Sequence, residues 1–265
     1  MPPKKPKGDY AISTVINALR LLEEFRATSE LGVTELAKRL ALHKNNVFRL
    51  LATLEQHGYI EQSAVNERYR LGSRCLDLGE AFSRSHPLLD RARPTLRELS
   101  RSVEETAHLA LMTSFEVVHV DAVVSQQAIL APSRVGQRLP VHCTALGKVL
   151  LGLGTNECRQ LYDETIVEGR PLAQRTAATI VDPLKFFEHI RTVAGQGFAL
   201  DVEECEVGLS CVGAPVYDRS GLVVAALSIS GPSSRLGVDH LMRHVVPRVS
   251  AAAASLSSDL GYGPR

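Results

Sequence analysis

A group of polar and basic residues stands directly before an apolar run in residues 43–54, HKNNVFRLLATL. At 100° per residue, a helix over this segment gathers its apolar side chains on one face, namely Val47, Leu50, Leu51 and Leu54. Asn45 and Arg49 then lie together on the opposite face, one turn apart. Asparagine pairs with the adenine edge and arginine with the guanine edge in the DNA major groove, each contact discriminating by about 1–3 kcal/mol. The alternative is that the asparagines only cap the helix and the charges are solvated.

Neighbouring side chains suit supporting contacts with DNA. Asn46 and Phe48 flank the outward face, and Phe48 has the shape to touch a thymine methyl group. Three basic residues are placed for phosphates, which fix position without reading sequence: Lys44, Arg68 and Arg70. The sequence therefore predicts recognition of double-stranded DNA.

The surrounding pattern supplies the elements that would position this helix. A helical pattern covers residues 14–26, with Val15, Leu19, Leu22 and Phe25 at helical spacing. A short helix follows Gly32, with Leu36, Ala37 and Leu40 expected to face inward. After Gly58, residues 59–71 predict a two-stranded hairpin that turns at residues 65–67. Two helices, a recognition helix and a hairpin form the order of a winged helix-turn-helix.

The rest of the chain predicts helices and then a mixed α+β domain. Residues 73–103 indicate a helical linker, interrupted near His86-Pro87 and at Pro94. Strands are expected over 108–114 and 116–124, and a hairpin over 211–232 turns at residues 218–221. Helices are expected over 144–153, 182–196 and 238–259. This order is typical of an α+β domain around an antiparallel sheet.

Composition limits the alternatives. The chain has 265 residues, 45% hydrophobic and 22% charged, which is typical of a globular protein of about two domains. No apolar run reaches the ~18 residues of a membrane helix, and the first residues have no apolar signal region, so we expect a cytoplasmic protein. Residues 1–9 indicate a disordered basic tail. Residues 1–74 hold 12 Lys or Arg and 8 Asp or Glu, whereas the rest holds 18 and 21, which weakly favours a nucleic-acid partner for the N-terminal part.

The cysteines point to reduced thiols rather than to disulfides or metal. They are odd in number and fit no paired motif: Cys75, Cys143, Cys158, Cys205 and Cys211. A metal site from His142, Cys143, Cys205 and Cys211 lacks the usual ligand spacing. A thiol enzyme using Cys143 or Cys211 has no base placed by a motif. We therefore expect no metal, no cofactor and no catalysis.

Several blocks in order resemble the IclR family of bacterial transcriptional regulators. Residues 33–60, VTELAKRLAL…NNVFRLLATLEQHGYI, resemble its DNA-binding helices, and YRLGSRCLDLG its wing and linker start. RVGQRLPVHCTALGKVLL, GFALDVEECEVGLSCVGAPVYDRSG and AALSISGP resemble the blocks of its effector-binding domain. The resemblance implies a winged helix over 10–72, a helical linker over 73–103 and a GAF- or profilin-like effector domain over 104–262. It also implies a dimer or tetramer, a palindromic operator, and a repressor or activator that responds to a small organic or aromatic acid.

The resemblance also implies an effector pocket. The matching positions are Ala128, Ala131, Leu139, Ala145, Leu146, Asp201, Cys211, Ser228 and Ser230. Ser228 and Ser230 alternate on an expected strand and so face the same side, although both hydroxyls could instead bond to their own backbone. The TALGK segment offers a helix N-terminus that suits a carboxylate, and we expect its Lys148 to be no more than a capping charge. Asp201 would repel an anion unless it is protonated or meets a hydroxyl. The three alanines suggest room for a ligand larger than a two- or three-carbon acid.

The chain departs from the family at the start of the recognition helix. The family commonly has Pro, a basic residue, Ser and a small residue, where this chain has His43, Lys44, Asn45 and Asn46. A proline would pre-set the backbone φ angle of the first turn. Both amides change the hydrogen-bonding face, so we expect an operator preference specific to this protein. A winged-helix regulator with a different sensor chemistry is the alternative.

Overall fold

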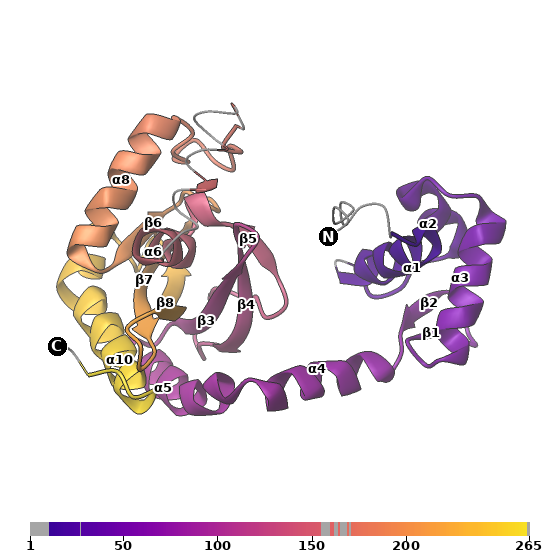
Figure 1. Ribbon diagram of the computed structural model, residues 1–265, viewed down its shortest axis with the longest axis horizontal. Helices are drawn as coiled ribbons and strands as arrows, with labels where there is room; N and C mark the ends of the chain where they lie inside the picture. Colours follow the sequence, from indigo (N-terminus) through magenta and orange to yellow (C-terminus); the bar gives the residue numbers. More distant parts are fainter. Residues whose placement is uncertain are drawn as a thin grey trace, which may run out of the picture. The chain divides into compact units, whose positions relative to one another are not determined.

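The computed structural model describes residues 11–26, 28–154, 160–161, 164, 169 and 171–263. The expected basic tail over residues 1–9 lies outside these ranges. The chain divides into two compact units, Met1–His86 and Pro87–Arg265 (Figure 1). Within the described residues, no helix is both long enough and apolar enough to cross a bilayer.

The first unit is a winged helix-turn-helix, as predicted. Its elements are α1 (Ser13–Glu23), a 3₁₀ turn (Glu24–Arg26), α2 (Val33–Leu40), α3 (Lys44–Gln56), β1 (Ile60–Gln62), β2 (Tyr69–Leu71) and α4 (Arg74–Ser85). β1 and β2 pair antiparallel, with Ile60 opposite Leu71. Gly58 has φ +74°, in the left-handed region that glycine adopts freely, and it turns the chain from α3 into the hairpin.

Apolar side chains from α1, α2 and α3 form the core of this unit. Leu36, Ala37 and Leu40 of α2 are buried as expected, and Val47 and Leu51 of α3 pack against them. Burying each such side chain contributes roughly 1.5–3 kcal/mol. The predicted inward face of α3 is therefore the observed one.

The apolar residues noted at helical spacing over 15–25 divide between two faces, since Leu22 and Phe25 pack on the core of the unit whereas Val15 and Leu19 do not. Leu21 and Phe25 are buried, whereas Val15 and Leu19 are 51% and 57% exposed. Ile12 and Ile16 are exposed beside them, so α1 carries a second apolar stripe that the core of its own unit does not cover. Spacing alone does not tell which of two apolar stripes on a helix packs inward.

The second unit is built on one six-stranded antiparallel sheet, and this confirms the predicted α+β class. The strands are β3 (Thr106–Thr113), β4 (Glu116–Val123), β5 (Arg138–Pro140), β6 (Ala199–Val202), β7 (Leu209–Tyr217) and β8 (Val223–Pro232), in the order β5-β4-β3-β8-β7-β6. The helical elements are α5 (Pro87–Val103), a 3₁₀ turn (Val141–Cys143), α6 (Ala145–Leu153), α8 (Pro183–Gln196), α9 (Val238–His240), a π-helical turn (Leu241–Val245) and α10 (Val246–Asp259).

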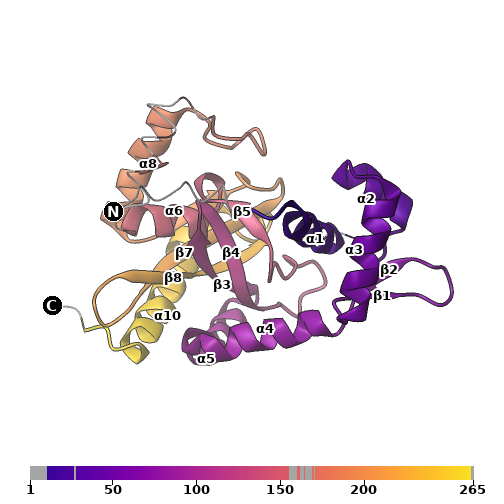
Figure 2. The same ribbon diagram turned by 45° about the vertical axis from the view of Figure 1, so that its right-hand side comes forward.

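Helices cover both faces of this sheet (Figures 1 and 2). α5 and α10 pack on one face against Leu109, Leu227 and Ile229, and α6 and α8 form a separate core on the other with Ala110 and Ala226. Successive strand residues point to opposite faces. Ser228 and Ser230 share the parity of Ala226 and therefore belong to the α6 face.

The residues expected as a linker, 73–103, are divided between the two units. α4 ends at Ser85 and α5 begins at Pro87, which confirms the interruption at His86-Pro87. The interruption predicted at Pro94 is wrong, because α5 continues through it. Pro94 lies on the exposed side of α5, whereas Leu89, Leu96 and Leu99 on the other side join the core under the sheet.

Candidate functional site

The outward face of α3 is polar and exposed, as its periodicity predicted. Lys44, Asn45, Asn46 and Arg49 are all exposed, and Phe48 is 57% exposed. Within the described residues, no hydrogen bond or ion pair holds the Asn45 amide or the Arg49 guanidinium. Both side chains are therefore free to meet base edges without first giving up a partner in the protein.

The two arginines of the hairpin are less free. The Arg68 guanidinium pairs with Glu35 of α2 at 2.6 Å and donates to the backbone carbonyl of Glu30 at 3.0 Å. Arg70 pairs across the hairpin with Glu61 at 2.5 Å. A phosphate would have to compete with these carboxylates. The sequence could not show this, because Arg68 and Glu35 are 33 residues apart.

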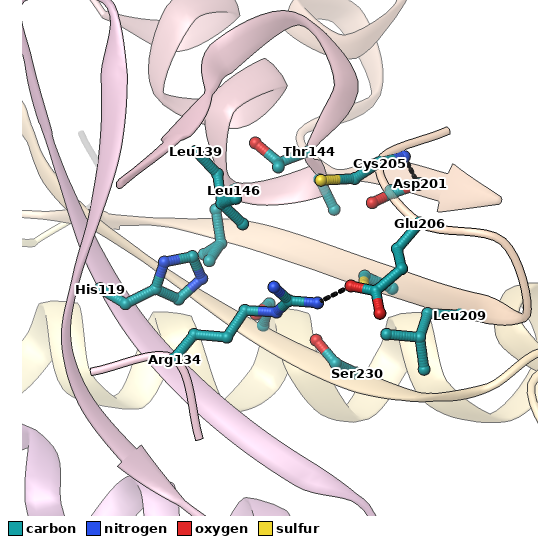
Figure 3. Close-up of a pocket in the computed structure, with 13 residues that line it drawn as sticks. His119, Arg134, Leu139, Thr144, Leu146, Asp201, Cys205, Glu206, Leu209 and Ser230 are labelled. Atoms are coloured by element: carbon teal, nitrogen blue, oxygen red, sulfur yellow. Dashed lines mark hydrogen bonds and ion pairs between the residues drawn. The ribbon is translucent and has the colours of Figure 1, made fainter. Parts of the chain in front are cut away.

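A cavity lies on the α6 face of the sheet in the second unit, and most of the pocket residues implied by the family resemblance surround it (Figure 3). Seven of them line it: Leu139, Ala145, Leu146, Asp201, Cys211, Ser228 and Ser230. They come from β5, α6, β6, β7 and β8. Gly213 of β7 allows this arrangement, because a Cβ there would lie 3.1 Å from the Ala145 backbone of α6.

Ala128 and Ala131 do not lie at this cavity. Ala128 is exposed, and Ala131 is buried where its carbonyl accepts a hydrogen bond from Thr106 at 2.7 Å. The space between the lining residues is about 30 Å³, room for roughly two water molecules. The expectation of a roomy pocket rested on three alanines, of which only Ala145 lines the cavity, so two of its three supports are lost.

Six further residues line the cavity and were missed from the sequence: His119, Arg134, Thr144, Cys205, Glu206 and Leu209. Arg134 and Glu206 form an ion pair across the cavity (Figure 3), between loops that are 72 residues apart in the chain. His119 gave no signal because it stands in an ordinary strand pattern. Thr144 was the one with a local signal, since it caps α6 by accepting a hydrogen bond from the Gly147 amide at 3.1 Å.

Burial changes the charges inside the cavity. It raises the pKa of Asp201 to about 7, although the Asp201 carboxylate also accepts the backbone N–H of Glu204 at 2.8 Å. It lowers the pKa of His119 to about 4 and that of His108, whose ring lies 5.3 Å from the His119 ring, to about 3. Near neutral pH both imidazoles are therefore uncharged and Asp201 is partly protonated. The repulsion of an anion by Asp201 is correspondingly reduced.

One buried hydroxyl group and one buried imidazole ring at the cavity have unused hydrogen-bonding capacity. Ser228 is 1% exposed and His119 is 4% exposed. Within the described residues, neither Ser228 Oγ nor His119 Nδ1 has a hydrogen-bond partner. The alternative in which Ser228 bonds to its own backbone is therefore not observed. A buried polar atom without a partner is costly and marks a place where a ligand can bond.

The environments of three thiols in the second unit shift their pKa values in different directions. A hydrogen bond to Cys205 and burial raise the pKa of Cys143, and burial raises the pKa of Cys211. The His142 ring nitrogen Nε2 is engaged with the Ala173 carbonyl at 2.9 Å. The pKa of Cys205 is lowered, first by its hydrogen bond from Cys143, but no motif places a base and an orienting group for it.

The described cysteines are not joined in disulfides, and Cys158 lies outside the described residues. Across the same described ranges, no three His, Cys, Asp or Glu side chains are grouped to hold a metal ion.

Lys148 is a buried ion-pair partner rather than a capping charge. Its side chain is fully buried, and Nζ donates to Glu204 at 2.5 Å and to the Leu200 carbonyl at 2.9 Å. The interaction ties α6 to the loop that follows β6 and carries Cys205 and Glu206. The interpretation from the sequence is corrected, because the helical segment gave no sign of the acidic partner 56 residues later.

A winged helix with a free polar recognition face, joined to an α+β domain with a polar cavity, defines a DNA-binding regulator with a sensor domain. Family models agree: the IclR helix-turn-helix domain matches residues 14–64, and the bacterial transcriptional regulator IclR C-terminal domain matches residues 81–258. The chain belongs to the IclR family of bacterial transcriptional regulators.

Individual relatives cover nearly the whole chain. The HTH-type transcriptional regulator XynR of Escherichia coli K12 is 36% identical over 95% of this chain and 98% of its own. The regulator KdgR of the same strain is 34% identical, over 97% and 95%. An IclR homologue from Microbacterium hydrocarbonoxydans, solved in complex with 4-hydroxybenzoate, has the same fold, with a TM-score of 0.79 and 24% identity over 94% of this chain and 99% of that one.

Proposed function

We propose that this protein is a ligand-responsive repressor that binds a palindromic operator through α3 and a small organic acid through the cavity beside α6. One observation carries the DNA-binding part: α3 buries Val47 and Leu51 while it leaves Asn45 and Arg49 exposed, with no side-chain partner in the part of the chain that the structure describes. In this proposal Asn45 contacts adenine, Arg49 contacts guanine, and Lys44 contacts a phosphate. Asn46 and Phe48 complete the outward face.

We propose that Arg68 and Arg70 contact the backbone only when their ion pairs open. The wing would then add less to DNA affinity than Lys44 does, because Glu35 and Glu61 compete for the same guanidinium groups.

Two copies of the chain would occupy the two halves of the operator, since a palindrome mirrors a two-fold axis in the protein. An exposed apolar stripe runs along α1 and the residue before it, and a second copy of the chain could cover it. The stripe is formed by Ile12, Val15, Ile16 and Leu19. The proposed setting is the bacterial cytoplasm, where the operator is. Size-exclusion chromatography with light scattering tests self-association, and a monomer at micromolar concentration on and off DNA would contradict it.

The sensor part of the proposal rests on the cavity. Seven residues implied by the family resemblance line it, and Ser228 Oγ lies there without a partner among the described residues. Effector binding would favour one arrangement of the DNA-binding units, and this requires different effector affinities in the DNA-bound and free states. We assign the protein no catalytic role.

The test measures binding of the protein by fluorescence anisotropy to DNA from the promoter region of its own gene, with a random duplex as the reference. We expect specific binding that weakens steeply with salt, and release of the operator by a carboxylic acid. Arg101→Ala is the matched control for Arg49→Ala, because Arg101 is an exposed arginine of the second unit. Equal affinity for promoter and random DNA would contradict the proposal.

A further inference from the structure

Arg134 is the permanently cationic group among the described residues that line the cavity. The side chain of Arg134 is only 15% exposed, whereas its partner Glu206 is 52% exposed. The two side chains of this ion pair therefore differ in how well water can solvate their charges when the pair opens. The Glu206 carboxylate returns to water at little cost, whereas the Arg134 guanidinium is left buried and needs another anion.

The loop that carries Arg134 holds the guanidinium at the cavity independently of Glu206. The backbone N–H of Gln137 donates to the Arg134 carbonyl at 2.8 Å, and the guanidinium donates to the Gln137 side chain at 3.3 Å. Figure 3 shows the guanidinium between the His119 ring and the Glu206 carboxylate. Arg134 is thus positioned to accept a different carboxylate in place of Glu206.

Other lining residues of the cavity suit the rest of an organic acid. Leu139, Leu146 and Leu209 give an apolar lining. His119 Nδ1 and Ser228 Oγ, both buried and without a partner among the described residues, can bond a hydroxyl or carbonyl oxygen. A single guanidinium among apolar walls fits a monocarboxylate better than a phosphate dianion, which would need more positive charge.

The cavity has little free space while the ion pair is closed. About 30 Å³ holds roughly two water molecules, and even a short carboxylic acid has more non-hydrogen atoms than that. The Glu206 side chain, on the loop between β6 and β7, is the exposed member of the pair and the one free to swing out. A ligand that enters therefore takes the place of the Glu206 carboxylate.

We propose that Arg134 binds the carboxylate of the effector, a monocarboxylate with a hydroxyl or carbonyl group, and that Glu206 is an internal competitor that this carboxylate displaces. The inference rests on the proposed function and names the class of its effector. It assigns specificity to two residues that the family resemblance did not imply.

The experiment is isothermal titration calorimetry of the full-length protein with lactate and 4-hydroxybenzoate, against lactamide and 4-hydroxybenzamide as neutral analogues. Inorganic phosphate serves as a third probe. The variants are Arg134→Gln, Arg134→Lys and Glu206→Gln. Arg138→Gln and Glu116→Gln are the matched controls, because these residues form an exposed ion pair at 3.4 Å in the same domain but do not line the cavity. Thermal unfolding of each variant verifies that it folds.

We expect at least one acid to bind wild type more tightly than its amide. Arg134→Gln should weaken binding of that acid by about 10–100-fold with little effect on binding of the amide. Arg134→Lys should recover part of the lost affinity. Glu206→Gln should tighten binding of the acid by about 2–5-fold, because the competitor has lost its charge. The control variants should bind as wild type does.

Four results would overturn the inference. Three are an acid that binds no better than its amide, an acid that retains its affinity in Arg134→Gln, and failure of both acids to bind wild type. The fourth is binding of phosphate in preference to the acids. Operator binding is measured separately by anisotropy, so specific DNA binding with an Arg134-independent ligand would sink this inference and leave the proposed function intact.

Discussion

Replacing one partner of the buried ion pair Lys148–Glu204 should lower the stability of the second unit far more than replacing both partners. Lys148 is fully buried and Glu204 is 11% exposed, with 2.5 Å between Nζ and Oε1. Burial raises the pKa of Glu204, and the Lys148 ammonium opposes that rise. Lys148→Met keeps most of the side-chain volume but leaves the carboxylate buried without its cation.

The expected loss follows from this geometry. Removing one partner of a buried pair costs about 3–5 kcal/mol, and in a unit of this size each kcal/mol lowers the melting temperature by about 2–4 °C. We therefore expect Lys148→Met to lower the transition of the second unit by about 6–20 °C. Lys148→Met combined with Glu204→Gln should recover at least half of that loss, because no buried charge remains.

Differential scanning calorimetry of the full-length protein measures this, with the transition of the first unit as an internal reference. The matched control is the exposed pair Arg101–Glu98 of α5, whose removal should cause no measurable shift. The loss in Lys148→Met should shrink as pH falls, because burial raises the pKa of Glu204 and a protonated carboxyl needs no cation. A shift below about 2 °C, or a double variant as unstable as both single losses together, would refute the reasoning.

Three further predictions concern recognition, pH and packing. Arg49→Ala should weaken operator binding by about 1–3 kcal/mol in anisotropy titrations with the fold retained, and equal weakening on random DNA would make Arg49 a phosphate contact. Because the folded-state pKa of Asp201 is raised to about 7 from an ordinary value near 4, folding holds a proton that the unfolded chain releases. The stability of the second unit should therefore fall by about 1–3 kcal/mol as pH rises from about 5 to 8, and urea titrations of Asp201→Asn should show a flatter profile, whereas an unchanged slope would exclude Asp201 as the cause. Gly147→Ala should destabilise the second unit by about 1–3 kcal/mol in calorimetry, since its Cβ would lie 2.3 Å from the Val141 carbonyl oxygen, and a melting temperature like that of wild type would contradict this packing.

Local periodicity determined what could be predicted about the first unit. In α3, the spacing of Val47 and Leu51 sets the buried face, and the same spacing puts Asn45 and Arg49 outward. This inference needs only the 3.6-residue helical period and a core on one side. α1 shows the limit, because it has two apolar stripes and only packing against α2 and α3 decided which of them is buried.

In the second unit the sequence predicted β3, β4 and the hairpin of β7 and β8 but not the short strands β5 and β6, and the family resemblance implied seven of the thirteen described residues that line the cavity. Only the tertiary structure joined residues whose relation has no local period. Lys148 meets Glu204 across 56 residues, and Arg134 meets Glu206 across 72. Such contacts are set by sheet order and loop packing, which side-chain spacing along one element does not encode. The charges that decide stability and ligand class in this domain therefore became visible only when the sheet brought distant loops together.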